Sequence, residues 1–291
     1  MESISPKKKI LITVCAVLFF ALFFWSQGRH GQFASVAFRL FPWIEELRQE
    51  RALQQLPVQE STATSSVEVP IFVYHSVRPY EPEPKEIDDF DITPELLERQ
   101  LQYLKDNAFT TISMDTLVDY FTKDKPLPPK SVILTFDDGW ENQYTYAFPL
   151  LKKYNATATF FIFTNSIGVR HFLTWQEIEE LHKNGMEIGS HTKSHPYLSK
   201  LTPDVLRQEI FESKKLLENH LGMRVTAFAT PFGYSSDLVT SLIGEAGYIS
   251  GRTLYRSVYH TKGDLLKLKS VLISDDFEEF KRMVTRDKVA K

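Results

Sequence analysis

Two carboxylates and two imidazoles stand out because their types and spacing suit metal chemistry. Asp137 and Asp138 are adjacent, and His191 and His195 lie four residues apart. At that spacing on a helical turn, both imidazole rings can face one ion. Two histidines and one carboxylate make a three-ligand set that leaves a coordination position open for water. The four residues therefore predict a metal site with room for a hydrolytic reaction.

Each half of this set also has a plainer interpretation. Asp and Gly favour turns, so Asp137-Asp138-Gly139 could only end a strand, and His191 and His195 could be surface histidines. A glycosidase pair does not fit, because consecutive strand residues point to opposite sides, whereas glycosidase carboxylates flank one bond at about 5 Å or more. Different roles are expected instead, one carboxylate binding a metal and the other handling a proton.

Further polar residues follow other predicted strands. His75 comes after a strand at 69–74, Pro231 and Gly233 follow one at 225–228, and Arg252 follows one at 248–250. The carboxyl ends of parallel barrel strands share one face, and that face carries active sites. His75 could alternatively be a core or rim histidine bonded to backbone. The remaining histidines are expected on loops or helix surfaces: His30, His171, His182, His220 and His260.

The elements that must position these residues alternate between apolar strands and amphipathic helices. Predicted strands cover 69–74, 109–112, 131–136, 157–163, 186–189, 225–228, 248–250 and 266–273. Predicted helices cover 94–106, 114–121, 142–154, 175–183, 203–221, 236–246 and 277–284. Four helices are expected to stop at Asn107, Asn155, Gly185 and Gly247, with Asn107 left-handed. Seven or eight βα units predict an α/β fold, a distorted (β/α)7–8 barrel, with an open doubly wound sheet as the alternative.

Composition and missing motifs narrow the function classes. The formal net charge of −3 gives no basic field for nucleic acid. No G-x-G-x-x-G or Walker-type loop is present, which removes the usual nucleotide-binding interpretation. Cys15 is the only cysteine, so no intrachain disulfide can form. Packing or a metal must therefore provide the stability.

The N-terminus predicts a membrane anchor. Lys7, Lys8 and Lys9 precede an apolar run at 10–25, which would span roughly 24 Å as a helix against a hydrocarbon core of about 30 Å. The following residues lack a clean small-x-small cleavage site, which favours an uncleaved anchor over a cleaved signal peptide. We expect an anchor at 1–26, a polar stalk at 27–66 and a catalytic domain at 67–291. The catalytic domain would lie on the extracytoplasmic side of the cell membrane, held by this single-pass anchor. If the signal is cleaved, the domain would instead be secreted.

Several motifs resemble those of one enzyme family. Thr135-Phe-Asp-Asp-Gly139 and His191-x-x-x-His195 resemble the first two motifs of the polysaccharide deacetylases, carbohydrate esterase family 4, and Pro231-Phe232-Gly233 is similar to the third. The segments 74–77 and 147–154 resemble the branch that contains extracellular poly-N-acetylglucosamine deacetylases. The resemblance runs from about residue 69 to 280, nearly the whole expected domain.

The resemblance implies a distorted (β/α) barrel and a divalent metal ion, zinc foremost, with cobalt, nickel, iron or manganese as alternatives. By motif position, Asp138, His191 and His195 would be the ligands. Asp137 would be the catalytic base and His75 the general acid. The implied reaction removes N-acetyl groups from a polymer containing N-acetylglucosamine, either exopolysaccharide or peptidoglycan, and releases acetate.

The sequence also departs from the family pattern. Ala229 and Thr230 precede Pro231, where the family has an arginine or an aromatic residue, and the late Leu-x-His motif is absent. Either His75 then supplies the acid or the acid is missing, and Arg252 could replace the absent arginine that would orient Asp137. The metal and a backbone N–H near Pro231 and Phe232, in the motif that ends at Gly233, would hold the developing oxyanion. The alternatives are a sugar-binding pseudoenzyme and a hydrolase of a non-sugar amide.

Overall fold

The computed structural model describes residue 52 and residues 66–79 and 91–285. The chain divides into two units, Met1–Ala52 and Leu53–Lys291, and the described strands, from Val67 onward, belong to the second unit. The predicted anchor and nearly all of the predicted stalk lie outside the described residues and stay predictions. Within the described ranges, no helix combines the length and apolar character needed to cross a membrane.

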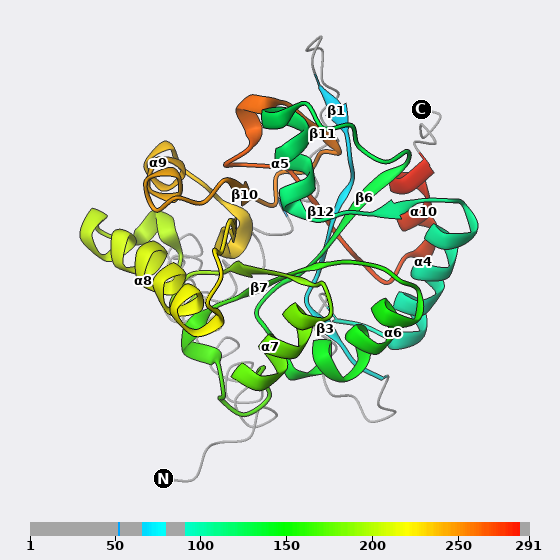
Figure 1. Ribbon diagram of the computed structural model, residues 1–291, viewed down its shortest axis with the longest axis horizontal. Helices are drawn as coiled ribbons and strands as arrows, with labels where there is room; N and C mark the ends of the chain where they lie inside the picture. The colour runs from blue at the N-terminus through cyan, green and yellow to red at the C-terminus, as the bar shows by residue number, and fades with distance from the viewer. Residues whose placement is uncertain (1–51, 53–65, 80–90, 286–291) are drawn as a thin grey trace, which may run out of the picture. The chain divides into compact units, whose positions relative to one another are not determined.

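A parallel sheet forms the centre of the second unit (Figure 1). Its strands run in the order β10-β9-β8-β7-β6-β2-β12, and β5 pairs with β6. The bounds are β2 (Ile71–Tyr74), β5 (Thr110–Thr111), β6 (Ser131–Phe136), β7 (Thr159–Ile162), β8 (Glu187–Ser190), β9 (Ala227–Ala229), β10 (Ser250–Arg252) and β12 (Val271–Leu272).

The strand order decides between the two predicted architectures. A doubly wound sheet reverses its order at a switch point, whereas here the order follows the chain from β2 to β10 and β12 returns beside β2. Thr253 N–H donates to the Leu268 carbonyl at 2.8 Å, and Val271 pairs with Phe72. The segment 265–272 is thus bonded to β10 at one end and to β2 at the other. The α/β class is confirmed, and the sheet is curled as in a partly closed barrel.

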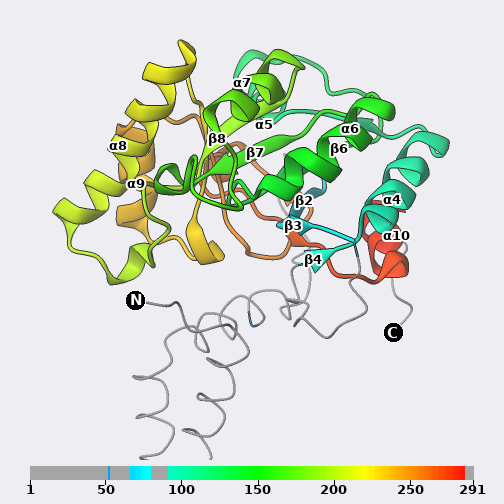
Figure 2. The same cartoon turned by 90° about the horizontal axis from the view of Figure 1, so that it is seen from below.

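Helices surround this sheet in both views (Figures 1 and 2). They are α4 (Pro94–Asp106), α5 (Met114–Lys123), α6 (Phe148–Lys153), α7 (Trp175–Lys183), α8 (Pro203–Leu221), α9 (Asp237–Glu245) and α10 (Phe277–Thr285). Short helical turns are η1 (Gln143–Ala147), η2 (Thr164–Ser166), η3 (Leu198–Lys200), η4 (Pro231–Gly233) and η5 (Lys262–Asp264). Two small pairs complete the unit, β1 (Val67–Glu68) with β11 (Tyr259–His260) and β3 (Ser76–Val77) with β4 (Asp91–Ile92).

The central strands are apolar on both faces, which explains why their sequences are continuous hydrophobic runs. Phe72 and Phe136 pack into an outer core that also contains buried residues of α4, α6 and α7. Their neighbours Ile71, Ile133 and Phe161 belong to an inner core with residues of α5. Alternate side chains of one strand therefore fill two separate cores. Both cores fix the strand ends from which the polar residues project.

Helix ends follow the expected chemistry with one correction. Asn155 ends its helix at φ 52°, as a left-handed cap should. Asn107 was predicted to be left-handed, and this is wrong, because its φ is −99°. Its side-chain amide donates to the Tyr103 carbonyl at 2.9 Å and caps the last turn directly. The left-handed position consequently moves one residue on, to Ala108 at φ 58°.

His260 corrects a second expectation. It was expected on a loop or helix surface, but its side chain is fully buried in β11. Its Nε2–H donates to the Val69 carbonyl at 2.9 Å, and its Nδ1 has no hydrogen-bond partner among the described residues. Burial lowers the pKa of His260 from the usual 6.5 to about 4. The folded protein therefore holds this imidazole neutral.

This buried histidine predicts a specific loss of stability in acid. An unfolded chain takes up a proton at His260 below pH 6.5, whereas the folded chain does so only near pH 4. Folding stability should then fall between these pH values by roughly 3 kcal/mol from this group. His260→Gln keeps an N–H donor and removes the titration. Urea unfolding at pH 7, 5.5 and 4 should show a smaller acid loss in the variant; parallel losses would contradict the assignment.

Candidate active site

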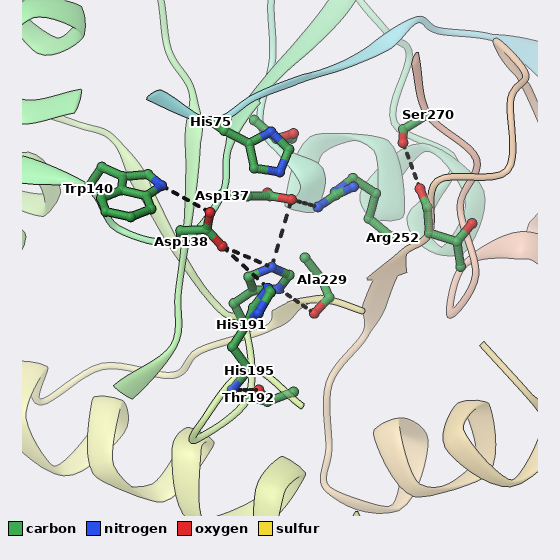
Figure 3. A network of polar contacts seen from close by, with 12 residues as sticks. His75, Asp137, Asp138, Trp140, His191, Thr192, His195, Ala229, Arg252 and Ser270 are labelled. Atoms are coloured by element: carbon green, nitrogen blue, oxygen red, sulfur yellow. Dashed lines mark hydrogen bonds and ion pairs between the residues drawn. The ribbon is translucent and has the colours of Figure 1, made fainter. Parts of the chain in front are cut away.

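The polar residues singled out in the sequence converge at the carboxyl ends of neighbouring strands (Figure 3). His75 follows β2, Asp137 follows β6, His191 follows β8, and Arg252 is the last residue of β10. Figure 3 shows the His75 ring on the same side of the cluster as Asp137 and Arg252. The shared face predicted for a parallel sheet is therefore where the structure brings these side chains together.

Asp138, His191 and His195 form the metal-ligating geometry. One carboxylate oxygen, Asp138 Oδ1, lies 3.4 Å from Nε2 of His195 and 3.7 Å from Nε2 of His191. Ligand atoms of the three residues all lie within 4.8 Å of one another. Asp138 Oδ1 is buried and has no hydrogen-bond partner in the described part of the chain. Two imidazole nitrogens and one carboxylate oxygen are the donor set of a catalytic zinc-type site, so these residues fit the implied ion.

The two histidines are brought together by a loop, not by the helical turn that the spacing suggested. Thr192 at φ 71° and His195 at φ 57° have left-handed backbone. The His195 N–H donates to Thr192 Oγ1 at 3.0 Å, which closes the loop between the ligands. The ring centroids of His191 and His195 consequently lie 4.7 Å apart.

Hydrogen bonds to the far sides of the ligands orient them. The Nδ1–H of His191 faces the Ala229 carbonyl at 2.8 Å, which leaves the Nε2 lone pair directed at Asp138. Burial lowers the pKa of His191 to about 4, against the opposing effect of the two carboxylates. The ring is thus neutral near pH 7, the form that binds metals. Trp140 Nε1–H donates to the other carboxylate oxygen of Asp138 at 3.0 Å.

The carboxylates of Asp137 and Asp138 both point to the metal-ligating site. The alternation of side chains along a strand would instead direct them to opposite sides. Asp138 has φ 75°, so the chain turns sharply after β6. Asp137 Oδ2 lies 3.9 Å and Asp138 Oδ1 3.7 Å from the same His191 nitrogen. Burial raises the pKa of Asp138, but the neighbouring His195, His75 and His191 and the Trp140 hydrogen bond outweigh it, and the pKa is lowered. Asp138 is therefore a carboxylate at neutral pH.

Asp137 differs from Asp138 in its partner. Arg252, which is fully buried, forms an ion pair through Nη2 with Asp137 Oδ2. The other oxygen, Asp137 Oδ1, is buried and has no hydrogen-bond partner among the described residues. One oxygen is therefore fixed by a cation, and the other is left to accept a proton. The orienting role suggested for Arg252 from the sequence requires such a contact and stays a prediction.

The Pro231–Gly233 turn borders the ligands on one side. Phe232 has φ 59°, and its ring lies 4.7 Å from that of His195 and 3.9 Å from that of Tyr197. Gly233 has φ 74°, and a Cβ at this position would overlap Leu254. Glycine is therefore required where the turn passes this side chain. The turn is thereby held against the edge of His195.

Two amides that the sequence reasoning missed hold the His75 segment. Gln143 is fully buried and its amide donates to the carbonyls of His75, at 2.8 Å, and Asp137. Asn142 accepts from the Val77 N–H at 3.1 Å. Asn142 precedes the π-helical turn η1 and Gln143 is its first residue, and Phe148 N–H donates to the Gln143 carbonyl. Such wide turns are frequent at functional sites.

A signal for Gln143 was present in the sequence. It lies four residues before Ala147 and eight before Leu151, both buried, so it is a polar residue on an apolar helix face. Pro149, which cannot donate a helical hydrogen bond, marks where the regular ladder is interrupted. Trp140 had no comparable signal, because only the folded turn brings its indole to Asp138.

Comparisons with known proteins identify the family of the chain. A family model described as polysaccharide deacetylase matches residues 124–250. The Bacillus subtilis protein YxkH, a polysaccharide deacetylase by its name, is 30% identical over 218 residues, which are 73% of this chain and 76% of that protein. The chain belongs to the polysaccharide deacetylase family. The resemblance inferred from the motifs is therefore confirmed.

Other members of the polysaccharide deacetylase family are similar over the same part of the chain. A poly-beta-1,6-N-acetyl-D-glucosamine N-deacetylase of Staphylococcus epidermidis is 28% identical over 226 residues, 70% of this chain and 78% of that protein. The structure of Streptococcus pyogenes deacetylase PplD, in complex with acetate, has a TM-score of 0.71 and 29% identity, covering 76% of this chain and 99% of that one.

Proposed function

We propose that this protein hydrolyses N-acetyl groups of a polymer containing N-acetylglucosamine, with a divalent ion held by Asp138, His191 and His195. One observation carries the proposal. The ligand atoms of these three residues converge, while Asp137, next to them, keeps one buried oxygen without a hydrogen-bond partner among the described residues. The site therefore supplies both the ligands of an ion and, beside them, a carboxylate that can deprotonate a water molecule.

The chain's own residues have distinct tasks in this reaction. When bound, the ion supplies positive charge that polarises an acetyl carbonyl and makes water more acidic. Asp137 accepts the proton of the attacking water, and its ion pair with Arg252 holds the carboxylate in place. The backbone N–H of Phe232 stabilises charge on the acetyl oxygen, because Pro231 has no N–H and the Gly233 N–H already donates to the Thr230 carbonyl at 2.9 Å. His75 donates a proton to the departing amine. Acetate and a free amino sugar result.

Two lines of support concern the ion and the substrate. The nitrogen-rich donor set favours zinc over hard, oxygen-preferring cations. Relatives 28% identical to this chain are named as poly-N-acetylglucosamine deacetylases, which supports a glucosamine polymer. We also propose that the domain works outside the cytoplasmic membrane, attached through residues 1–26, because extracellular polymers that contain N-acetylglucosamine are located there.

Acetate release across a glycan panel tests the function. The zinc-loaded protein is expected to release acetate and expose amines on poly-β-1,6-N-acetylglucosamine more readily than on chitin oligomers or peptidoglycan fragments. Asp137→Asn keeps the shape of the side chain and should lower the rate by about 10²-fold or more, since the base is lost.

Two results would contradict the proposal in different ways. Glycan binding without acetate release, in a zinc-loaded protein, would indicate a sugar-binding pseudoenzyme. Amine release from a non-sugar acetamide alone would move the reaction to another amide. The intact set of Asp137, Asp138, His191 and His195 argues against the first outcome.

A further inference from the structure

The loop that carries both histidine ligands is held by a residue from outside it. Glu209 lies in α8, and its carboxylate is buried. Its Oε2 accepts hydrogen bonds from the N–H groups of Lys193, at 3.0 Å, and Ser194, at 2.8 Å. Its Oε1 accepts from Ser194 Oγ at 2.6 Å. Three donors between the two ligands thus end on one carboxylate.

The carbonyls of the same loop are bound on its other side. Thr164 N–H donates to the Thr192 carbonyl at 3.1 Å, and Asn165 N–H donates to the Lys193 carbonyl at 2.8 Å. Both donors belong to η2, which follows β7. The loop N–H groups therefore donate to Glu209 of α8, and the loop carbonyls accept from the N–H groups of η2. These backbone groups between the two ligands thus have fixed hydrogen-bond partners.

The loop needs this external support because its own geometry is unfavourable. Thr192 has a left-handed backbone that β-branched residues rarely adopt, and His195, whose residue type tolerates this conformation better, adopts it as well. Such conformations persist only where surrounding contacts determine them. Without the carboxylate of Glu209, the two partly buried amide N–H groups would lose their acceptor, and the loop would relax away from the geometry that places His195 beside Asp138.

We propose that Glu209 is a positioning residue of the metal centre, which sets metal affinity by holding the histidine loop in its strained form. This inference rests on the proposed function, since it presumes that His191 and His195 bind an ion. A carboxylate suits the task because it is an acceptor only and offers two oxygens to three donors. Outer partners that orient metal ligands typically contribute about 10- to 100-fold in affinity.

Cobalt binding to the full-length protein tests the proposal without reference to turnover. The apoprotein is titrated with Co²⁺, and the dissociation constant and the visible absorption spectrum are recorded. Glu209→Ala should bind Co²⁺ about 10- to 100-fold more weakly, with an altered spectrum because the His195 ligand is displaced. Glu209→Gln should largely restore both, since its carbonyl oxygen can accept the two amides and its NH₂ can donate to the Ser194 hydroxyl.

Glu212 offers a matched control on the same helix. It contacts Lys193 only through the exposed side-chain ammonium, at 2.6 Å, so Glu212→Ala should leave cobalt binding unchanged. A folded Glu209→Ala protein with wild-type affinity and spectrum overturns the proposal. If that variant does not fold, Glu209→Asp decides, because its shorter side chain keeps the charge but cannot span the three donors. If Glu209→Asp binds cobalt with wild-type affinity, the proposal is overturned. If the wild-type protein itself binds no cobalt, the metal site is overturned as well.

Discussion

Asp138→Ala is expected to remove stoichiometric metal and to lower turnover by about 10³-fold or more. Its Oδ1 is the atom that both histidine Nε2 atoms approach, at 3.4 and 3.7 Å. Without it, the two imidazoles lose their carboxylate co-ligand, and the adjacent Asp137 carboxylate is paired with Arg252. A catalytic ion contributes several kcal/mol of transition-state stabilisation, and about 1.36 kcal/mol corresponds to a tenfold change in rate.

Metal analysis after gel filtration provides the measurement. His191→Ala and His195→Ala should lose the ion as well, while His182→Ala, an exposed histidine of α7, should keep both metal and activity. Full metal content in all three ligand variants would show that the ion binds elsewhere.

His75→Ala is expected to lower kcat on the acetylated glycan by about 10²- to 10⁴-fold, the usual contribution of a general acid. Metal content should be unchanged, because His75 is not one of the three converging ligands. An amine must be protonated as it departs, whereas a phenolate departs without a proton. The same variant should therefore hydrolyse an activated aryl acetate at nearly the wild-type rate.

The ratio of the two rates separates a proton donor from a structural histidine. A structural role would lower both rates together, or neither once the folded fraction is corrected. Gln143→Ala is a useful comparison, since it removes the hydrogen bond to the His75 carbonyl while leaving the imidazole in the chain. Equal losses on glycan and aryl ester in His75→Ala would exclude it as the acid.

The sequence predicted the strand ends well because parallel strands impose a simple rule. The buried run at 131–136 is β6 with the same bounds, and the polar residues that follow it must lie at the carboxyl edge. The helix predicted at 175–183 also has the same bounds in the structure. Such local patterns of burial and capping do not depend on distant contacts.

The inner geometry of the site could not be predicted in this way. Asp138, Thr192, His195 and Phe232 all have positive φ, a conformation that few non-glycine residues adopt and that local sequence does not locate. Contacts from other elements hold these conformations, such as the Glu209 carboxylate from α8. His260 was misplaced for a related reason, because it pairs with Val67 in β1 and donates to the Val69 carbonyl, both far away in the chain. Residues far apart in the chain decided each of these features.

The return of β12 to the side of β2 has a consequence for biosynthesis. β2 pairs with β6 on one edge and with β12 on the other, and β12 is formed by almost the last described part of the chain. At translation rates of roughly 5–20 residues per second, the interval between completing β6 and completing β12 is on the order of ten seconds. Throughout it the apolar β2 strand presents an open edge, the feature that promotes strand-mediated aggregation. Nascent chains that stop before residue 271 should therefore depend on chaperones far more than the finished protein does.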